Sequence, residues 1–271
     1  MDKRWPTLYI PHGGGPCFFM PVSPGLPPDM WDRLAAYLKG IDAALGRRPT
    51  AVLVISGHWE TPRPTVNTAR DHTLLFDYYG FPDDTYRLTY PAHNAPETVA
   101  RIEECLTRAG YRPDEDATRG LDHGVFVPFK LIYPEADVPM VQLSLLASLD
   151  AAAHVRLGHA LAPLRDAGVL IVGSGMSFHN LRAMYAEGPQ IDAAARAFDD
   201  WLTDAATDPD PERRDAKLAR WEEAPYARFC HPREEHLLPL HVAAGAGGGD
   251  VGRQVFGEAL VGKALSGYQF G

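Results

Sequence analysis

The sequence predicts an α/β protein in which residues 1–271 form a single domain, with a mostly parallel central sheet flanked by helices. Short apolar runs alternate along the chain with stretches whose apolar residues recur at helical spacing. The run AVLVIS at 51–56 is β-branched and continuously apolar, as in a strand covered on both faces. No change in composition marks a linker, and 271 residues suffice for one large core.

The first half of the chain alternates strand and helix patterns around two irregular segments. Residues 11–28 are too rich in Gly and Pro for regular structure, and residues 74–96 are aromatic and turn-rich, which suits a loop over a site. The expected regular elements are a strand at 7–10, a helix at 29–45, a strand at 51–56 and a helix at 96–110 with Pro at its start and Gly at its end.

The second half continues this alternation. Pro239 is tolerated only in the first turn of a helix, so a helix should begin near Leu237 and place His236 at its N-terminal junction. The Gly-rich stretch at 244–250 is expected to be a short flexible loop. The other expected elements are a strand at 138–145, a helix at 151–167 that Gly168 ends, a strand at 169–175, a helix at 190–206 and short surface helices within 208–228.

Charge and composition indicate a cytoplasmic protein with a small-molecule partner. The formal net charge of −9 disfavours nucleic acid and anionic membranes, which recruit basic surfaces. The N-terminus lacks a signal-type apolar segment, and no run of about 18 apolar residues is present to span a bilayer. Cys17, Cys105 and Cys230 are odd in number and lack CxxC spacing, which fits a reducing compartment.

Three of the eleven histidines follow short apolar runs, which places them at expected strand ends: His12 in TLYIPHGGG, His58 in AVLVISGHW and His179 in VLIVGSGMSFHNL. Side chains beyond the carboxyl ends of the strands in an open α/β sheet converge on one crevice. Three converging imidazoles suggest a metal site. His123 in LDHG lies next to Asp122, and the spacing fits either an imidazole held by that carboxylate or a solvent-facing turn.

Three further histidines, His231, His236 and His241, are spaced by five residues. One continuous helix would rotate them by about 140° from one another, so they could not share a metal. At most one of them is a ligand, and His236 at the predicted helix start is best placed. We expect His231 to cap a helix or be exposed, and His241 to pack. The remaining histidines are expected to be surface or core residues: His72, His93, His154 and His159.

Neutral imidazoles are suitable ligands for zinc or iron, and a metal with three protein ligands and open coordination positions is typical of a catalytic site. The absence of thiolate spacing argues against structural zinc. A further histidine near the metal but not bound to it would be free to move protons. A serine nucleophile is disfavoured, because GSGMS at 173–177 lacks the final glycine of the G-x-S-x-G elbow. Cys17 is expected to be a buried small residue rather than a nucleophile.

Several motifs occur in order along the chain: HGGGP at 12–16, SGHW at 56–59, LDHG at 121–124, GSGMSFHNLR at 173–182 and EHLLPL at 235–240. In this order they resemble the class III extradiol ring-cleavage dioxygenases of the LigB superfamily, in particular its 4,5-DOPA dioxygenase extradiol branch. The resemblance extends from His12 to about Ala246. It implies an α/β fold with the active site at the carboxyl ends of the strands, and opening of the aromatic ring of a catechol-type substrate, DOPA-like or another small catechol, with O2.

The resemblance also implies roles for five histidines. His12, His58 and His236 would hold Fe(II) in the working enzyme, with Zn(II) able to occupy the same site in isolated protein. His179 would be the acid–base residue that faces substrate and oxygen. His123 would be a second active-site histidine that stabilises the bound oxygen or a substrate oxyanion.

Several other residues near these motifs have alternative roles. Many superfamily members bind metal with two histidines and one carboxylate, but the matched position here is a histidine, and the neighbouring Glu234 and Glu235 are expected to point elsewhere. Arg182 could meet a substrate carboxylate or form a structural ion pair, and Asn180 could orient His179. Aromatic side chains that could wall the substrate ring, or merely pack a loop, are Phe18, Phe19, Phe76, Tyr78, Tyr79, Phe81, Tyr86 and Tyr90.

Two other functions stay open from the sequence. A Memo-type protein shares this fold and a histidine-lined cleft but recognises a partner without catalysis, and the presence of all five histidines argues against it. A zinc hydrolase is the second of these alternatives. The sequence indicates no partner beyond a small aromatic diol and O2, names no substrate-binding residue, and leaves a homo-oligomer neither required nor excluded.

Overall fold

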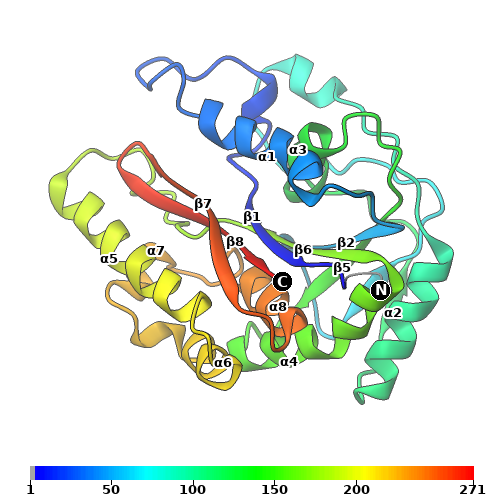
Figure 1. The fold of residues 1–271 in the computed structure, drawn as a ribbon. Helices are drawn as coiled ribbons and strands as arrows, with labels where there is room; N and C mark the ends of the chain where they lie inside the picture. The colour runs from blue at the N-terminus through cyan, green and yellow to red at the C-terminus, as the bar shows by residue number, and fades with distance from the viewer. Residues whose placement is uncertain (1–3) are drawn as a thin grey trace.

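A computed structural model describes residues 4–271 of the chain (Figure 1). The strands are β1 (Thr7–Pro11), β2 (Ala51–Thr61), β3 (Thr65–Asn67), β4 (Asp114–Asp116), β5 (Met140–Leu146), β6 (Val169–Gly175), β7 (Gly252–Leu260) and β8 (Lys263–Phe270). The α-helices are α1 (Asp32–Leu45), α2 (Pro96–Arg108), α3 (His123–Ile132), α4 (Ala151–Leu161), α5 (Pro189–Ala206), α6 (Pro211–Ala219), α7 (Ala227–Cys230) and α8 (Leu238–Gly247). Short 3-10 helices occur at Cys17–Phe19, Asp83–Arg87, Ala162–Ala167 and Trp221–Glu223.

All eight strands form one sheet, in the order β4-β3-β5-β2-β6-β1-β8-β7. The four central neighbours β5, β2, β6 and β1 are parallel; Leu53 of β2, for example, pairs with Val141 on one side and Ile171 on the other. β3 runs antiparallel to β5, and β8 runs antiparallel to β1. The sheet is therefore mixed but mostly parallel, and the predicted α/β fold class is confirmed.

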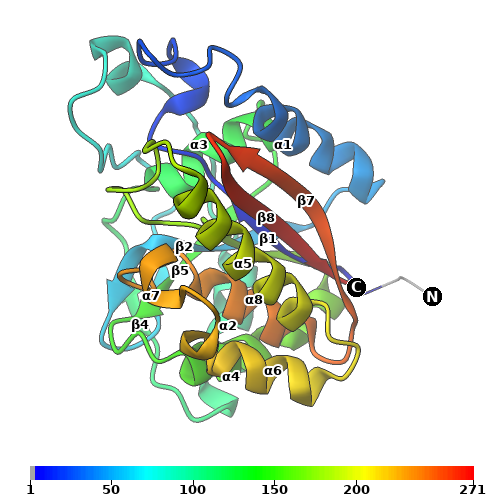
Figure 2. The same ribbon diagram turned by 90° about the vertical axis from the view of Figure 1, so that its left-hand side faces the viewer.

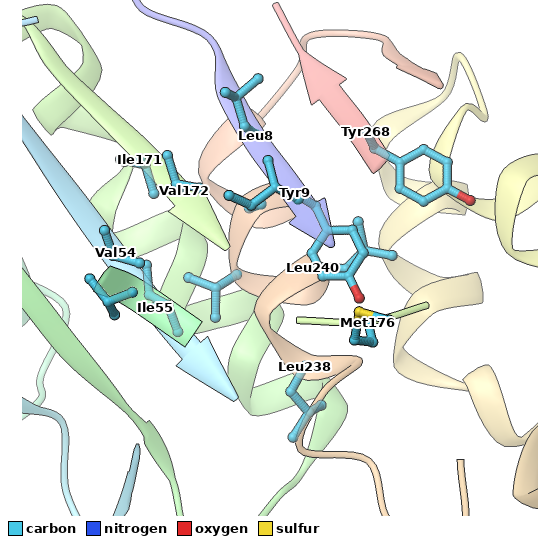
Figure 3. Packing of buried hydrophobic residues seen from close by; sticks show 14 of the residues in the cluster. Leu8, Tyr9, Val54, Ile55, Ile171, Val172, Met176, Leu238, Leu240 and Tyr268 are labelled. Atoms are coloured by element: carbon cyan, nitrogen blue, oxygen red, sulfur yellow. The ribbon is translucent and has the colours of Figure 1, made fainter. Parts of the chain in front are cut away.

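Helices cover both faces of this sheet (Figures 1 and 2). α1 and α3 pack together on one face, while α8 lies against β1 and β6 on the other face with α4 packed on it. Central-strand side chains such as Val54 and Ile171, and Leu240 of α8, are fully buried between the layers (Figure 3). Burial of these apolar side chains is the main force that holds the layers together.

Most predicted elements are present, with boundaries shifted by a few residues. The helix predicted at 29–45 begins at Asp32, because the chain first makes turns in which Met30 N–H bonds to Pro27 C=O and Asp32 N–H bonds to Asp29 C=O. The helix predicted at 151–167 changes to a 3-10 helix after Leu161.

The prediction of a flexible loop at 244–250 is wrong for its first half, because residues 244–247 belong to α8 and are buried. The reason is close helix packing. A Cβ on Gly245 would lie 2.2 Å from the carbonyl oxygen of Val155 in α4, and a Cβ on Gly158 would lie 2.2 Å from that of Val242 in α8. Glycine here permits backbone approach rather than flexibility.

The C-terminal hairpin of β7 and β8 was not predicted. β7 mixes exposed and buried residues and lacks a long apolar run, so the sequence offers little strand signal there. β8 is nevertheless almost fully buried, because it pairs with β1 and is covered by α5. The hairpin thereby completes the edge that β1 would otherwise expose.

Among residues 4–271, no helix has the length and apolar character needed to cross a bilayer. The three cysteines are unpaired. Cys17 is buried, and burial raises the pKa of its thiol, which disfavours the reactive thiolate. This agrees with the expectation of a buried small residue at position 17.

Candidate metal centre and active site

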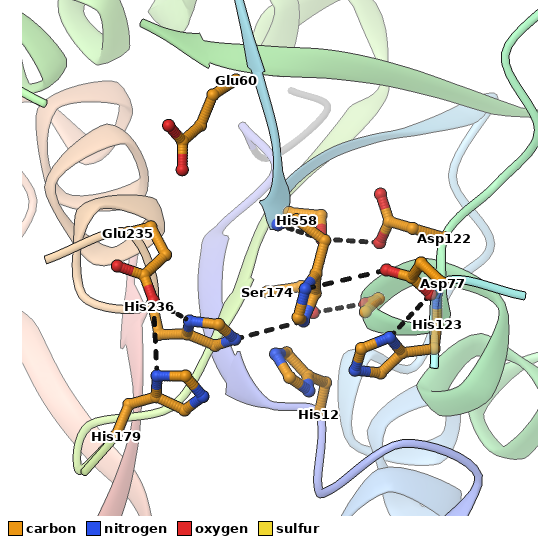
Figure 4. Close-up of polar contacts among 12 residues, drawn as sticks. His12, His58, Glu60, Asp77, Asp122, His123, Ser174, His179, Glu235 and His236 are labelled. Carbon is orange, nitrogen blue, oxygen red and sulfur yellow. Dashed lines mark hydrogen bonds and ion pairs between the residues drawn. The ribbon is translucent and has the colours of Figure 1, made fainter. Parts of the chain in front are cut away.

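Five histidines from separate parts of the chain gather at the carboxyl-terminal end of the parallel strands (Figure 4). His12 follows β1, His58 lies in β2, His123 is the first residue of α3, His179 lies in the loop after β6, and His236 precedes α8. All five line one cavity. The convergence expected from strand ends is therefore present.

His58 lies inside β2, which extends beyond the strand end predicted at Ser56. β2 pairs with β6 only as far as Ser56, and its register with β5 shifts between Ile55 and Glu60. Such a shift interrupts the regular alternation of side chains and re-aims them, which is common beside functional sites.

The glycines after His12 make the sharp turn that keeps this residue in the cluster. Gly13 and Gly15 have φ angles of +84° and +55°, which residues other than glycine rarely adopt. A Cβ on Gly15 would also lie 2.9 Å from the ring of Phe81. The turn and the opposite wall of the site therefore require glycine at position 15.

His58 is central in the cluster. Its ring centroid lies 4.0 Å from that of His123, 4.6 Å from that of His236 and 5.0 Å from that of His12. The Nε2 atoms of His58 and His236 are 3.1 Å apart. On the other side of His236, the ring of His179 stacks with a centroid separation of 3.4 Å.

Asp77 holds two of these rings. Its Oδ1 lies 2.8 Å from His123 Nδ1, and its Oδ2 lies 3.7 Å from His58 Nδ1. The sequence pointed to Asp122 as the carboxylate beside His123, or to a solvent-facing turn; neither is found, because His123 is buried and Asp122 accepts hydrogen bonds from Ser56 and Gln142. Asp77 lies 46 positions from His123 in the aromatic loop, and no local pattern marked it.

Glu235 holds the other pair. Its Oε1 lies 3.0 Å from His236 Nδ1 and 3.4 Å from His179 Nδ1, so the expectation that Glu235 points elsewhere is wrong. Glu234 does point away and pairs with Arg228. Asn180 does not orient His179, because its amide donates to the carbonyl oxygen of Phe229. Adjacency to His236 was the one signal that could have identified Glu235.

Burial sets the protonation of the inner histidines. Burial, together with the neighbouring rings, lowers the pKa of His12, His58 and His236 well below its ordinary value. These rings are therefore neutral at physiological pH, which is the form that binds metals. His12 donates from Nδ1 to the carbonyl oxygen of Gly13 at 2.8 Å, and its buried Nε2 has no partner among the described residues.

The two carboxylates stay ionised. Burial acts to raise the pKa of Asp77 and of Glu235, but the hydrogen bonds and charge of His123 and His179, respectively, outweigh burial, and the pKa of each carboxyl is lowered. An ionised carboxylate fixes a proton on Nδ1 of the ring it contacts, and so leaves Nε2 of that ring as the atom available to a ligand.

The five histidines form the inner end of a cavity of about 660 Å³. Of the aromatic residues named as candidates for its walls, Tyr78 and Phe81 line it. Phe76 and Tyr86 pack against Tyr78 instead. The candidate Arg182 is exposed and does not belong to the cavity lining.

The remaining histidines lie outside the cluster. His231 caps the C-terminus of α7, where its backbone N–H donates to the carbonyl oxygen of Ala227, so the first of its two expected roles is confirmed. The alternative, an exposed residue, is wrong, because His231 is fully buried with Nε2 2.9 Å from the carbonyl oxygen of Ser177. Its ring is enclosed by the helical layer of α5 and by Trp221, which the sequence could not place beside it. His241 is buried, as expected. His72 and His154 are buried, and His93 and His159 are exposed.

Known proteins are similar to this chain in sequence and in fold. Residues 6–270 match the family described as the catalytic LigB subunit of aromatic ring-opening dioxygenase. The chain is 43% identical over 204 residues to the 4,5-DOPA dioxygenase extradiol of Beta vulgaris, with 74% of this chain and 75% of the relative covered. It is 40% identical over 257 residues to dioxygenase tasH of Hapsidospora irregularis, with 89% and 78% covered.

A solved structure agrees with these sequence matches. The crystal structure of an uncharacterised protein from Escherichia coli K12 is similar with a TM-score of 0.76 and 28% sequence identity, covering 99% of this chain and 100% of the other. Family match, relatives and solved structure each span most of the chain. This chain belongs to the LigB family of extradiol, aromatic ring-opening dioxygenases.

Proposed function

We propose that this protein is a non-heme Fe(II)-dependent extradiol dioxygenase that opens the aromatic ring of a small catechol with O2. The observation that carries the proposal is the convergence of five histidines at the inner end of one cavity. In this reaction the ring C–C bond beside the diol breaks and both atoms of O2 enter the product. The diol supplies the electrons, so no external reductant is consumed.

His12, His58 and His236 are the proposed metal ligands. Two nitrogens bound to one ion at about 2.0–2.1 Å lie roughly 3 Å apart, and the Nε2 atoms of His58 and His236 are separated by 3.1 Å. The unpartnered, buried Nε2 of His12 fits a third ligand. Gly13 and Glu235 contact the Nδ1 atoms of His12 and His236, the usual arrangement behind metal-bound histidines.

His123 is the alternative third ligand, because ligand atoms of His12, His58 and His123 also lie within 4.8 Å of one another. We favour His236 because its Nε2 is the atom nearest to His58 Nε2 at a ligand-like separation. An all-histidine site carries less negative charge than two histidines with a carboxylate, so it should tolerate Zn(II) as well as Fe(II).

His179 and His123 are the proposed residues that act on the substrate. The chemistry that Fe(II) supplies when bound is chelation of both diol oxygens and electron transfer from the diol to oxygen. Nε2 of His179, the ring nitrogen that Glu235 does not contact, would take the proton from one catechol hydroxyl. Nε2 of His123 faces the same cavity and would stabilise a negatively charged oxygen.

The activity is tested by loading the protein with Fe(II) without oxygen, adding catechol and then admitting O2. We expect uptake of one O2 per catechol and a yellow semialdehyde product. Full activity of a preparation that contains only zinc would overturn the iron assignment. Absence of oxygen uptake by the Fe(II)-loaded protein would favour a Memo-type binding protein or a zinc hydrolase.

The ligand set is tested by the metal content of two variants after dialysis. His236→Ala should lose bound metal, whereas His123→Ala should retain it and lose turnover. The reverse result would make His123 the third ligand. Circular dichroism of both variants controls for loss of fold.

The cytoplasm is the compartment we propose, because the three cysteines are unpaired. Fractionation of cells that express the protein tests this assignment. Recovery of the protein from an extracytoplasmic fraction would overturn it.

A further inference from the structure

We propose that the substrate is a catechol with a neutral, apolar substituent, and that a catechol with a carboxylate or an amino-acid side chain is a poor substrate. This inference rests on the proposed dioxygenase function and specifies the chemical class that the same cavity takes. The walls of the cavity beyond the five histidines carry the argument.

The cavity is larger than a one-ring diol needs. Its volume of about 660 Å³ lies within the roughly 300–1,000 Å³ of pockets that bury drug-sized ligands. Beyond the histidines, its lining continues along the segment 20–31 on one side and the segment 181–185 on another. A catechol whose hydroxyls lie at the histidines therefore leaves an outer volume for a ring substituent.

The outer walls are apolar and adaptable. Four of the six methionines of the chain line the cavity: Met20, Met30, Met176 and Met184. Unbranched thioether side chains fill irregular gaps and adjust to ligands of different shape. This lining favours alkyl or aryl substituents of more than one shape.

The walls offer no cation to an acidic substituent. Among the described residues that line the cavity, none is Lys, Arg, Asp or Glu. The nearest charges behind the histidines are the carboxylates of Asp77 and Glu235, which are themselves negative. A substrate carboxylate in the outer cavity would lose water without gaining a cationic partner, which is costly, whereas an alkyl group gains by burial.

The rim of the cavity is apolar as well. Leu181 is 70% exposed and Tyr185 is 45% exposed, and both belong to the lining. A Cβ on Gly14 would lie 3.4 Å from the Tyr185 hydroxyl, so this ring lies over the glycine turn that follows His12. Large apolar side chains exposed at the mouth of a cavity are typical of a binding site for apolar groups.

The binding test uses calorimetry on the Fe(II)-loaded protein without oxygen, so that no turnover occurs. The probes are catechol, 4-butylcatechol and 3-(3,4-dihydroxyphenyl)propionate, of which the last two have similar length and differ in charge. We expect 4-butylcatechol to bind about 30-fold more tightly than catechol and the propionate to bind no more tightly than catechol. Equal affinity for the two substituted catechols would overturn the inference.

The turnover test separates this inference from the proposed function. On the Fe(II)-loaded enzyme with O2, kcat/KM should follow the order of affinities. If the enzyme consumes no O2 with any of the three catechols, the proposed function fails, while the calorimetric preference still tests the substrate class. If catechol is cleaved but the propionate has the higher kcat/KM of the two substituted probes, this inference alone fails.

A charge placed on the rim provides the matched variant. Leu181→Arg should strengthen binding of the propionate by about 10-fold and weaken that of 4-butylcatechol, because it supplies the missing cation. Val251→Arg is the control, since Val251 is 56% exposed and lies outside the cavity lining. Unchanged selectivity in Leu181→Arg, or the same change in Val251→Arg, would refute the role of the rim.

Discussion

Asp77 Oδ1 accepts two hydrogen bonds from His123, one from its backbone N–H at 3.0 Å and one from its ring Nδ1 at 2.8 Å. One carboxylate oxygen thus fixes both the start of α3 and the orientation of the ring. Because the carboxylate is ionised, it keeps a proton on Nδ1 and leaves Nε2 as the ring nitrogen directed toward the cavity. Asp77 is therefore a positioning residue for His123.

Replacement of Asp77 should separate its structural role from its electrostatic role. Asp77→Asn keeps an acceptor for the His123 backbone N–H, so we expect a Tm close to that of the wild type. Loss of the charge should lower kcat by about 10–100-fold, the usual effect of removing a carboxylate behind an active-site histidine. Asp77→Ala should lower both kcat and Tm. Wild-type kcat in the Asn variant would contradict the positioning role.

His179→Ala should lower kcat by about 100–10,000-fold, the usual contribution of a general acid–base group. Its metal content should equal that of the wild type, because His179 is not among the proposed ligands. His159→Ala serves as the control, since His159 is exposed and contacts Asp215 away from the cavity. Loss of metal from His179→Ala would instead place His179 in the coordination sphere.

Two Gly→Ala substitutions should change the free energy of unfolding in opposite directions, because Gly158 lies in the contact between α4 and α8 and Gly40 lies in open space. A Cβ on Gly158 would lie 2.2 Å from the Val242 carbonyl oxygen and 2.8 Å from the Ala246 nitrogen, backbone atoms that cannot rotate aside. Gly158→Ala should therefore reduce the free energy of unfolding by about 1–3 kcal/mol. Gly40→Ala in α1 meets nothing within 4 Å and should increase it by about 0.5–1 kcal/mol. Urea denaturation distinguishes the two, and equal effects would exclude close packing as the reason for Gly158.

Asp199 should make stability fall as pH rises. Burial in α5 raises the pKa of Asp199 to about 6, although Ser266 donates a hydrogen bond to it. In the unfolded chain the pKa is about 3.9, so the folded state binds the proton more tightly. The stability contribution is therefore complete below about pH 4 and is lost as pH rises through about 6, by at most about 3 kcal/mol.

Asp199→Asn should remove this loss of stability at high pH. Its free energy of unfolding should exceed that of the wild type at pH 8 and show a flatter profile between pH 4 and 7, measured by urea denaturation. Asp83→Asn, at an exposed position, is the control. A wild-type profile in Asp199→Asn would show that this carboxyl does not titrate with folding.

The helical and strand patterns of the chain were enough for the fold class, because periodicity and breakers are local properties. AVLVIS predicted a strand covered on both faces, which is β2, and Pro239 located the start of α8 and hence His236. The glycine-rich end of α8 misled the prediction, because glycine at a helix contact and glycine in a flexible loop look alike in sequence. The hairpin of β7 and β8 was missed, because its strands are stabilised by pairing with β1 and not by a local pattern of apolar residues.

By itself, the sequence determined which histidines are brought together, because strand ends and ordered motifs identify them one at a time. Only the tertiary structure decided which carboxylates and which other rings contact each of these histidines. His58 and His236 are 178 positions apart yet have Nε2 atoms in contact, and the carboxylates of Asp77 and Glu235 each reach two rings. Such pairings depend on how the layers pack, and packing joins positions whose separation along the chain carries no signal.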